Sequence, residues 1–287
     1  MSRRVAAFCP GHISGYFKRV DGPDAATTGS VGAGLVISEG VLACVTPAER
    51  TDITVWQTDH SRNRVRIAGD SPPIRYAMKK LSVDASVMTE CRLPVGAGFG
   101  LSAAALLATI TALNQLYDIG MDERRIAHLA HETEIVHRTG LGDVTSCRGG
   151  GMVVRTVAGI DAPVRRIHGL SGPVSAVSFG PINTPSVLGS PGQMEKVAAA
   201  FPSGEPKTIE DFFSYSRAFT EKSGLITPQV REVLDFCDHN GINASMTMLG
   251  NGVFAYGDDA EPILSRFSSV HSMAVAKNGP VLLKEEP

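Results

Sequence analysis

The sequence is poor in cysteine and has no long apolar run. Its five cysteines are an odd number and include no CxxC spacing. That argues against a structural zinc site and favours reduced thiols. No uncharged apolar run reaches the length of a membrane span. The apolar run after residues 1–4 is short and is broken by Pro10-Gly11-His12, unlike the longer apolar region of a signal peptide. We therefore expect a cytoplasmic protein with no membrane partner.

The sequence also lacks a strong excess of charge of either sign. Its formal net charge is −2, and 20% of its 287 residues are charged. This balance gives no reason to expect nucleic acid as a partner. Apolar residues make up 43% of the chain, which is ordinary for a globular protein with one or two sizeable cores.

Strand and helix patterns alternate irregularly, which predicts an α+β fold. The expected strands cover residues 3–9, 34–46, 51–57, 84–92, 152–157, 174–180, 243–248, 252–256 and 271–276. The expected helices cover residues 72–82, 102–117, 122–137, 192–201, 208–222, 228–239 and 258–267. Residues 181–192 are expected to form a loop rich in Pro, Gly and Ser. A cluster of glycines between residues 159 and 172 suggests two domains, 1–165 and 166–287.

The most informative segment is Pro94-Val95-Gly96-Ala97-Gly98-Phe99-Gly100-Leu101-Ser102, which leads into an alanine-rich helical pattern. Glycine permits a positive φ and a close approach of the backbone to a ligand. A helix N-terminus offers free N–H groups and a partial positive charge, which together attract anions. Ser102 stands where the helix should begin, so its hydroxyl either caps the helix or meets the ligand. The segment therefore predicts a phosphate-binding loop.

Three interpretations of this loop can be compared. The P-loop pattern GxxxxGK[ST] is absent, because no lysine stands next to Ser102. The relaxed dinucleotide fingerprint GxGxx[GA] is matched from Gly98 to Ala103, but no acidic residue ends a strand about twenty residues further on. A dehydrogenase thus stays open as an alternative, as does a glycine-rich turn without a ligand.

The whole segment resembles the ATP-binding loop of the GHMP kinases, usually written P-x-G-x-G-L-G-S-S-A-A. Phe99 stands here at the leucine position, Leu101 replaces the first serine, and Ser102 is the second. Two further landmarks are present. Pro10-Gly11-His12 resembles the turn of the first motif, in which His12 has a structural role. Residues 245–252 stand where the third motif is expected, without its Gly-x-Gly-Gly run.

The resemblance implies a fold, cofactors and catalytic residues. The fold would combine an N-terminal domain of the ribosomal-S5 type with a ferredoxin-like C-terminal domain, and ATP would lie between them. Mg²⁺ would be held by Ser102 and by Glu134, with Glu132 as the alternative, and Asp143 would deprotonate the acceptor hydroxyl. The residues expected to hold ATP are Pro94, Gly96, Ala97, Gly98, Phe99, Gly100, Leu101 and Ser102.

Residues 29–34, 139–144 and 246–251 are similar to those of the pantoate kinases, an archaeal branch of the superfamily. This similarity implies phosphorylation of pantoate to 4-phosphopantoate in coenzyme A biosynthesis, by a possible homodimer. It also implies a substrate shell of Ser30, His131, Arg155 and Thr184. Arg155 ends an apolar strand, and its planar guanidinium suits a carboxylate. Two alternatives stay open, namely a GHMP kinase of the homoserine or mevalonate type and a non-catalytic ligand sensor of the same fold.

Overall fold

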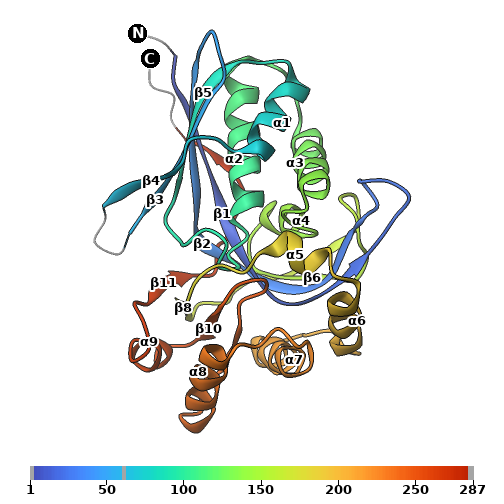
Figure 1. The fold of residues 1–287 in the computed structure, drawn as a ribbon, viewed down its shortest axis with the longest axis vertical. Coiled ribbons are helices and arrows are strands. Elements are labelled where there is room, and N and C mark those ends of the chain that lie inside the picture. Colours follow the sequence, from blue (N-terminus) through green and yellow to red (C-terminus); the bar gives the residue numbers. More distant parts are fainter. Residues whose placement is uncertain (1–2, 60–62, 284–287) are drawn as a thin grey trace.

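The strands of the computed structural model, which describes residues 3–59 and 63–283, form two sheets (Figure 1). The larger sheet has the path β12-β1-β2-β5-β3-β4, and β6 and β7 extend it from one end of β2. Its strands are β1 (Val5–Val20), β2 (Gly29–Pro47), β3 (Asp52–Thr58), β4 (Arg64–Ala68), β5 (Ala85–Cys91), β6 (Met152–Arg155), β7 (Val164–Ile167) and β12 (Val281–Leu282). The pairing is antiparallel except between β3 and β5.

Helices cover one face of the larger sheet (Figure 1). They are α1 (Pro72–Leu81), α2 (Leu101–Leu116), α3 (Glu123–His137) and the short α4 (Asp143–Cys147). The central helix, α2, packs on β1 and β2 and is also covered by α1 and α3. Eleven of its sixteen residues are buried, so it is apolar around most of its circumference, as a helix between two layers must be. Asp122 caps α3 by accepting a hydrogen bond from the backbone N–H of Arg125, as the sequence predicts.

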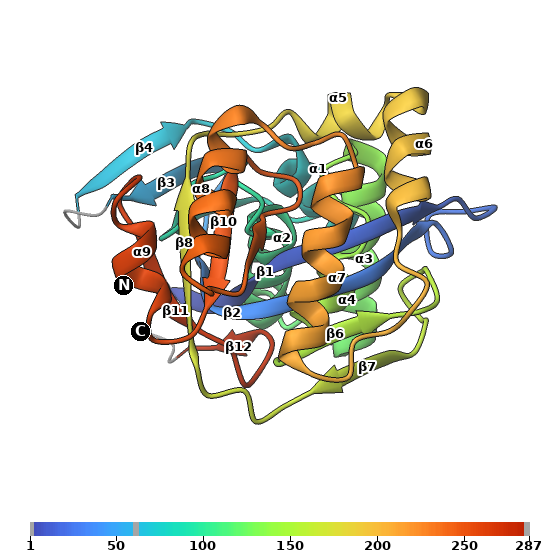
Figure 2. The ribbon, with the colours of Figure 1, turned by 90° about the horizontal axis from the view of Figure 1, so that it is seen from below.

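The smaller sheet is antiparallel and has the order β11-β8-β10-β9. Its strands are β8 (Pro173–Ser178), β9 (Ala244–Met246), β10 (Gly252–Tyr256) and β11 (His271–Ala274). Its helices are α5 (Thr184–Leu188), α6 (Pro191–Ala200), α7 (Ile209–Lys222), α8 (Pro228–His239) and α9 (Ala260–Leu264). Figure 2 shows α7, α8 and α9 on the outer side of this half of the molecule. Strand order and connections are those of a βαββαβ unit, which confirms the expected α+β class.

The two halves are joined through β1, which packs against α6 and α7 of the half that contains the smaller sheet. Gly15 allows β1 to lie close to α7, because a Cβ there would stand 2.7 Å from the Phe212 ring. Tyr16 meets the rings of Phe201 and Phe219 at centroid distances of 5.6 and 6.4 Å. The chain also returns to the larger sheet at its end, where β12 pairs with β1, and β7 spans the division expected after residue 165. That division stays a prediction.

The structure corrects the secondary structure expected at several places. Pro10-Gly11-His12 is not a turn: β1 continues through it, and the irregularity is a register shift between Pro10 and Gly11. Strands β4 and β7 and helices α4 and α5 occupy segments in which we expect no such element. The start of α5 carries ordinary helix-start chemistry, since the Asn183 side chain accepts a hydrogen bond from the N–H of Ser186.

Candidate active site

The glycine-rich loop runs from β5 to the first turn of α2. Gly96, Gly98 and Gly100 have φ values of 80°, 85° and 62°, a region that side chains disfavour. Gly100 is the N-cap of α2, so the N–H groups of the following turn have no acceptor within the helix. Such a backbone, ending at a positive helix terminus, is an anion-binding concavity.

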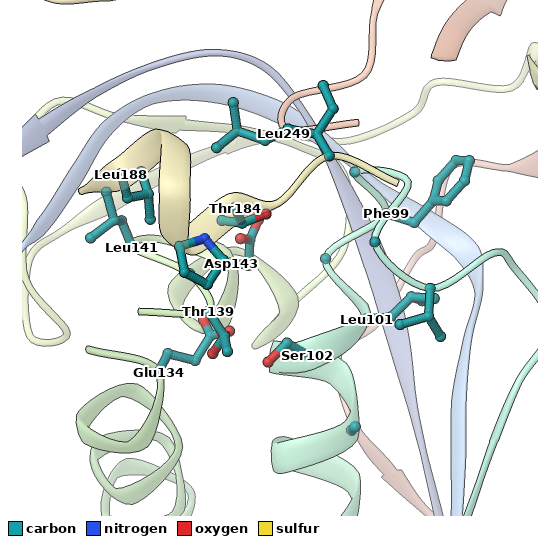
Figure 3. Close-up of a pocket in the computed structure, with 18 of the residues that line it drawn as sticks. Phe99, Leu101, Ser102, Glu134, Thr139, Leu141, Asp143, Thr184, Leu188 and Leu249 are labelled. Atoms are coloured by element: carbon teal, nitrogen blue, oxygen red, sulfur yellow. The ribbon is translucent and has the colours of Figure 1, made fainter. Parts of the chain in front are cut away.

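Ser102 is the second residue of α2 and does not cap it, because the structure shows no side-chain cap bond at this helix. The capping interpretation of Ser102 is therefore wrong. Its hydroxyl faces the Glu134 carboxylate instead, as Figure 3 shows, and this contact lowers the pKa of Glu134 against the larger effect of burial. A serine from α2 and a glutamate from α3 thus meet at one point.

The third motif closes on the glycine-rich loop from the smaller sheet. A Cβ on Gly250 would lie 2.0 Å from the Ala97 carbonyl oxygen, and one on Gly98 would lie 3.0 Å from the Thr247 Cβ. Two glycines therefore let the segments touch, even though the Gly-x-Gly-Gly run is missing. Phe99 is buried in this contact zone and its ring meets that of His271 edge-on.

A cavity of about 600 Å³ lies between the loop, the end of α3, α4 and α5. From the region of β3, β4 and the start of α1, its wall receives Val55, Ile67 and Pro72. The expected site residues that line the cavity are Gly96, Gly98, Phe99, Gly100, Leu101, Ser102, Glu134, Asp143, Ser30, Arg155 and Thr184. Pro94, Ala97 and His131 are not among the described residues of its wall.

Glu134 is buried, with 1% of its surface exposed. Thr139 donates a hydrogen bond to its Oε1 at 3.4 Å, whereas Oε2 has no hydrogen-bond partner among the described residues. Burial, together with the charge of Asp143, raises the pKa of Glu134 to about 8. A buried carboxylate with an unpartnered oxygen is costly unless something else satisfies it. The alternative, Glu132, points to Lys80 and Tyr76, each 2.8 Å away, and is not part of the cavity wall.

Asp143 begins α4 and is held by a histidine far away in the sequence. His12 Nδ1 lies 2.7 Å from Asp143 Oδ1. The His12 side chain is wholly buried and its Nε2 has no partner among the described residues. Burial lowers the pKa of His12 against the opposing effect of Asp143, so the neutral ring donates through Nδ1–H. Burial alone would raise the pKa of Asp143, but the His12 hydrogen bond and the charge of Arg155 bring it below its ordinary value.

Space for the His12 ring comes from a glycine on the neighbouring strand. A Cβ on Gly34 would lie 2.2 Å from His12 Nε2. From the sequence we expect only a structural role for His12. The structure instead places it against the expected catalytic base. Its place in the Pro-Gly-His motif was visible in the sequence, but no spacing could reveal a contact across 131 positions.

Arg155 is the buried cation of the site, 3% exposed at the end of β6. It donates hydrogen bonds to the Ser30 carbonyl and hydroxyl oxygens at 3.4 Å, and to the Ser146 hydroxyl. Among the described residues no carboxylate forms an ion pair with it. Burial lowers the pKa of Arg155, yet a guanidinium stays charged in proteins. The charge of Asp143 acts on Arg155 from beyond ion-pair distance, so the hydrogen-bond partners of the guanidinium are neutral oxygens and a further anion would be favoured beside it.

The other two expected substrate residues differ in position. Thr184, at the first position of α5, lines the cavity on the same side as Asp143 (Figure 3). His131 lies elsewhere: its Nε2–H donates to the Thr28 carbonyl oxygen at 2.9 Å. Burial lowers the pKa of His131, so the ring is a neutral part of the packing of α3 against the start of β2.

Within the described residues no group of three or more His, Cys, Asp and Glu side chains gathers as a ready-made metal site. Glu134 and Ser102 nevertheless supply two oxygen donors, and Mg²⁺ in kinase sites typically takes one or two protein ligands and completes its shell with phosphates and water. The same part of the chain contains no helix with the length and apolarity needed to cross a bilayer.

Comparison with known proteins identifies relatives of the chain. Residues 73–151 match the GHMP kinases N terminal domain. A pantoate kinase of Methanospirillum hungatei is 44% identical over 98% of this chain and 96% of its own length. One from Thermococcus kodakarensis is 30% identical over 90% of this chain and 89% of its own.

Solved structures agree with this assignment. A "phosphotransferase related to CoA biosynthesis pathway" superposes with a TM-score of 0.79 at 26% identity, covering 97% of this chain and 98% of its own. A homoserine kinase from Cytophaga hutchinsonii has a TM-score of 0.67 at 15% identity, covering 98% of this chain and 97% of its own, and so shares the fold. Because a curated pantoate kinase matches nearly from end to end, and the glycine loop, Glu134 and Asp143 meet in one cavity, the chain belongs to the pantoate kinase family of the GHMP kinases.

Proposed function

We propose that the protein transfers the γ-phosphoryl group of ATP to the terminal hydroxyl of pantoate. The observation that supports this most directly is the shared cavity, in which a phosphate loop, an oriented carboxylate and a buried arginine lie together. Phosphoryl transfer needs positioning and charge neutralisation more than covalent chemistry. The cavity offers both.

The nucleotide phosphates would bind the backbone N–H groups of the loop from Gly96 to Ser102. Ser102 and Glu134 fit a hard divalent ion, because the unpartnered Glu134 Oε2 is the kind of buried oxygen that such an ion satisfies. Bound there, Mg²⁺ would neutralise negative charge on the phosphates. The chain's own contribution is to hold these two oxygens from separate helices at one point.

Asp143 acts as the general base in this proposal. It takes the proton of the acceptor hydroxyl while that oxygen bonds to the γ-phosphorus, and the bond from this phosphorus to the bridging oxygen breaks to release ADP. His12 donates to Oδ1, so it fixes the carboxylate and leaves Oδ2 for the substrate. His12 is thus a positioning residue for the base.

The buried Arg155 favours an acceptor that carries a carboxylate in addition to the reacting hydroxyl. Three acidic side chains line the described part of the cavity, namely Asp70, Glu134 and Asp143. Asp70 is paired with Arg75 at 3.0 Å, and the other two serve the metal and the base. No further acid is left for the ammonium group of an amino acid such as homoserine, which favours a hydroxy acid. His131 does not line the cavity, so we assign it no direct contact with the substrate.

A coupled ADP-release assay over pantoate, mevalonate and homoserine tests the proposal, with ATP and NADH titrations alongside. We expect turnover with pantoate and binding of ATP but not NADH. Turnover of mevalonate or homoserine with none for pantoate would overturn the acceptor, and no turnover with any of them would favour a ligand sensor.

Three further features belong to the same proposal: dependence on Mg²⁺, a homodimeric state and a cytoplasmic location. Activity should disappear when divalent ions are chelated and return with Mg²⁺. Sedimentation of the purified chain should give twice the mass of one chain. A fully active monomer would show that the protein does not need to form a homodimer, and the proposed phosphoryl transfer would be unaffected.

A further inference from the structure

The acceptor side of the cavity has an apolar wall that the chemistry described above does not use. Phe17, Leu141 and Leu188 line it, beside the polar Ser30, Thr184 and Arg155. All three apolar side chains are nearly buried, with 6%, 9% and 5% of their surfaces exposed. Phosphate, metal and hydroxyl groups are polar or charged, so contact with an apolar surface does not stabilise them.

One residue of this apolar wall, Leu141, is close in sequence to the proposed base, Asp143. Leu141 belongs to the same turn as Asp143, two residues before it, and Figure 3 draws Leu141 and Leu188 together on the Asp143 side of the cavity. A group that touches Leu141 therefore lies within a few atoms of the hydroxyl that Asp143 meets. Arg155 would hold the acceptor's carboxylate nearby, so the wall faces the carbon atoms between these two ends.

Leu188 is fixed in place from several directions. The Arg19 guanidinium donates to the Leu188 carbonyl oxygen at 3.2 Å, and Asn183 caps the start of α5. At the other end of the helix, Gly189 N–H donates to the Pro185 carbonyl oxygen at 3.0 Å. A wall held this way discriminates by shape, because it cannot collapse onto a smaller ligand or retreat from a larger one.

We propose that Leu141 and Leu188, with Phe17, form a specificity wall that recognises a branched carbon between the carboxylate and the reacting hydroxyl of the acceptor. Pantoate has such a carbon, bearing two methyl groups. The inference rests on the proposed function and deepens it: the acceptor class is a branched hydroxy acid, selected by apolar contact as well as by Arg155. Hydrophobic pockets distinguish ligands by about 10- to 200-fold per methylene.

The test compares kcat/KM for pantoate, for its analogue without the two methyl groups, and for its bulkier diethyl homologue. The natural chain should prefer pantoate over each by at least about tenfold. Leu188→Ala and Leu141→Ala should each reduce the preference over the unbranched analogue by about tenfold, from lost contact. The same variants should improve relative use of the diethyl homologue. Ratios measured on one preparation are independent of how much of a variant has folded.

Leu264→Ala is the matched control, because Leu264 is also a buried leucine but lies on α9 and is not part of the cavity wall. Its ratios should equal those of the natural chain. If the natural chain uses pantoate but the two wall variants leave both ratios unchanged, the wall is not a specificity element. Equal use of branched and unbranched acceptors by the natural chain overturns it as well. Failure to use pantoate at all instead overturns the proposed function, together with this inference.

Discussion

At the scale of single residues, Asp143 and His12 form a pair whose members have different tasks. As the proposed base, Asp143 needs one carboxylate oxygen for the substrate, and the His12 ring, 2.7 Å from Oδ1, engages the other oxygen. Because His12 is buried and neutral, it orients the base without adding a proton that could be lost at working pH.

Asp143→Asn should lower kcat by about 10²–10⁴-fold, the usual contribution of general-base catalysis. Asparagine keeps the shape of the side chain but cannot accept the proton. ATP affinity, measured by calorimetry on the same preparation, should change little. Unchanged turnover would remove Asp143 from the role of base.

Replacing His12 should move the pH profile. Asp143 works deprotonated, so kcat falls as pH drops through the pKa of Asp143 in the complex. The His12 hydrogen bond helps to lower that pKa, and His12→Leu removes it. The acid limb of kcat should therefore move to higher pH.

His12→Asn is the matched control, because its amide places a donor near the position of Nδ1. This variant should keep the acid limb close to that of the natural chain. An acid limb that is the same in both variants would show that His12 only fills space.

At the scale of elements, the glycine loop depends on the third motif that packs against it. Gly98→Ala places a Cβ 3.0 Å from the Thr247 Cβ and 3.1 Å from the Gly250 nitrogen. The loop must shift, so we expect the KM for ATP to rise about tenfold or more.

Gly120→Ala separates this effect from backbone strain. Gly120 also has a positive φ, 74°, but a Cβ there meets no atom within 4 Å. Both variants should lose roughly 1 kcal/mol of unfolding free energy from strain, measured by urea denaturation. Only Gly98→Ala should bind ATP more weakly. Equal ATP affinity in both variants would show that packing of the third motif against the loop does not affect nucleotide binding.

The elements show where sequence patterns suffice and where they fail. Helices α2 and α3 were predictable because their apolar spacing and the Asp122 cap are local. It was predictable from the family resemblance that the loop, Glu134 and Asp143 line one cavity. The role of His12 was not, because its contact depends on the pairing of β1 with β2 and on Gly34. The position of His131 was not predictable either, because the spacing of residues on a helix does not show which segment packs against that face.

At the scale of the whole molecule, β1 and β2 serve both halves. Tyr16 and Phe17 of β1 meet Phe219 of α7 at ring distances of 6.4 and 6.0 Å. Neither half can unfold without exposing apolar surface of the other. We expect one thermal transition in calorimetry, with equal calorimetric and van't Hoff enthalpies. Two separated transitions would show that the halves are independent.

The buried charge of Arg155, which forms no ion pair among the described residues, links occupancy of the cavity to the thermal stability of the chain. A carboxylate that reaches the guanidinium forms an ion pair with it only in the folded state, and a ligand at 100 times its Kd stabilises that state by about 2.7 kcal/mol. Simple anions such as malonate should therefore raise Tm and compete with the acceptor. Arg155→Gln should abolish both effects. We therefore expect carboxylate buffers to inhibit this protein weakly, so its affinity for an acceptor is best measured in their absence.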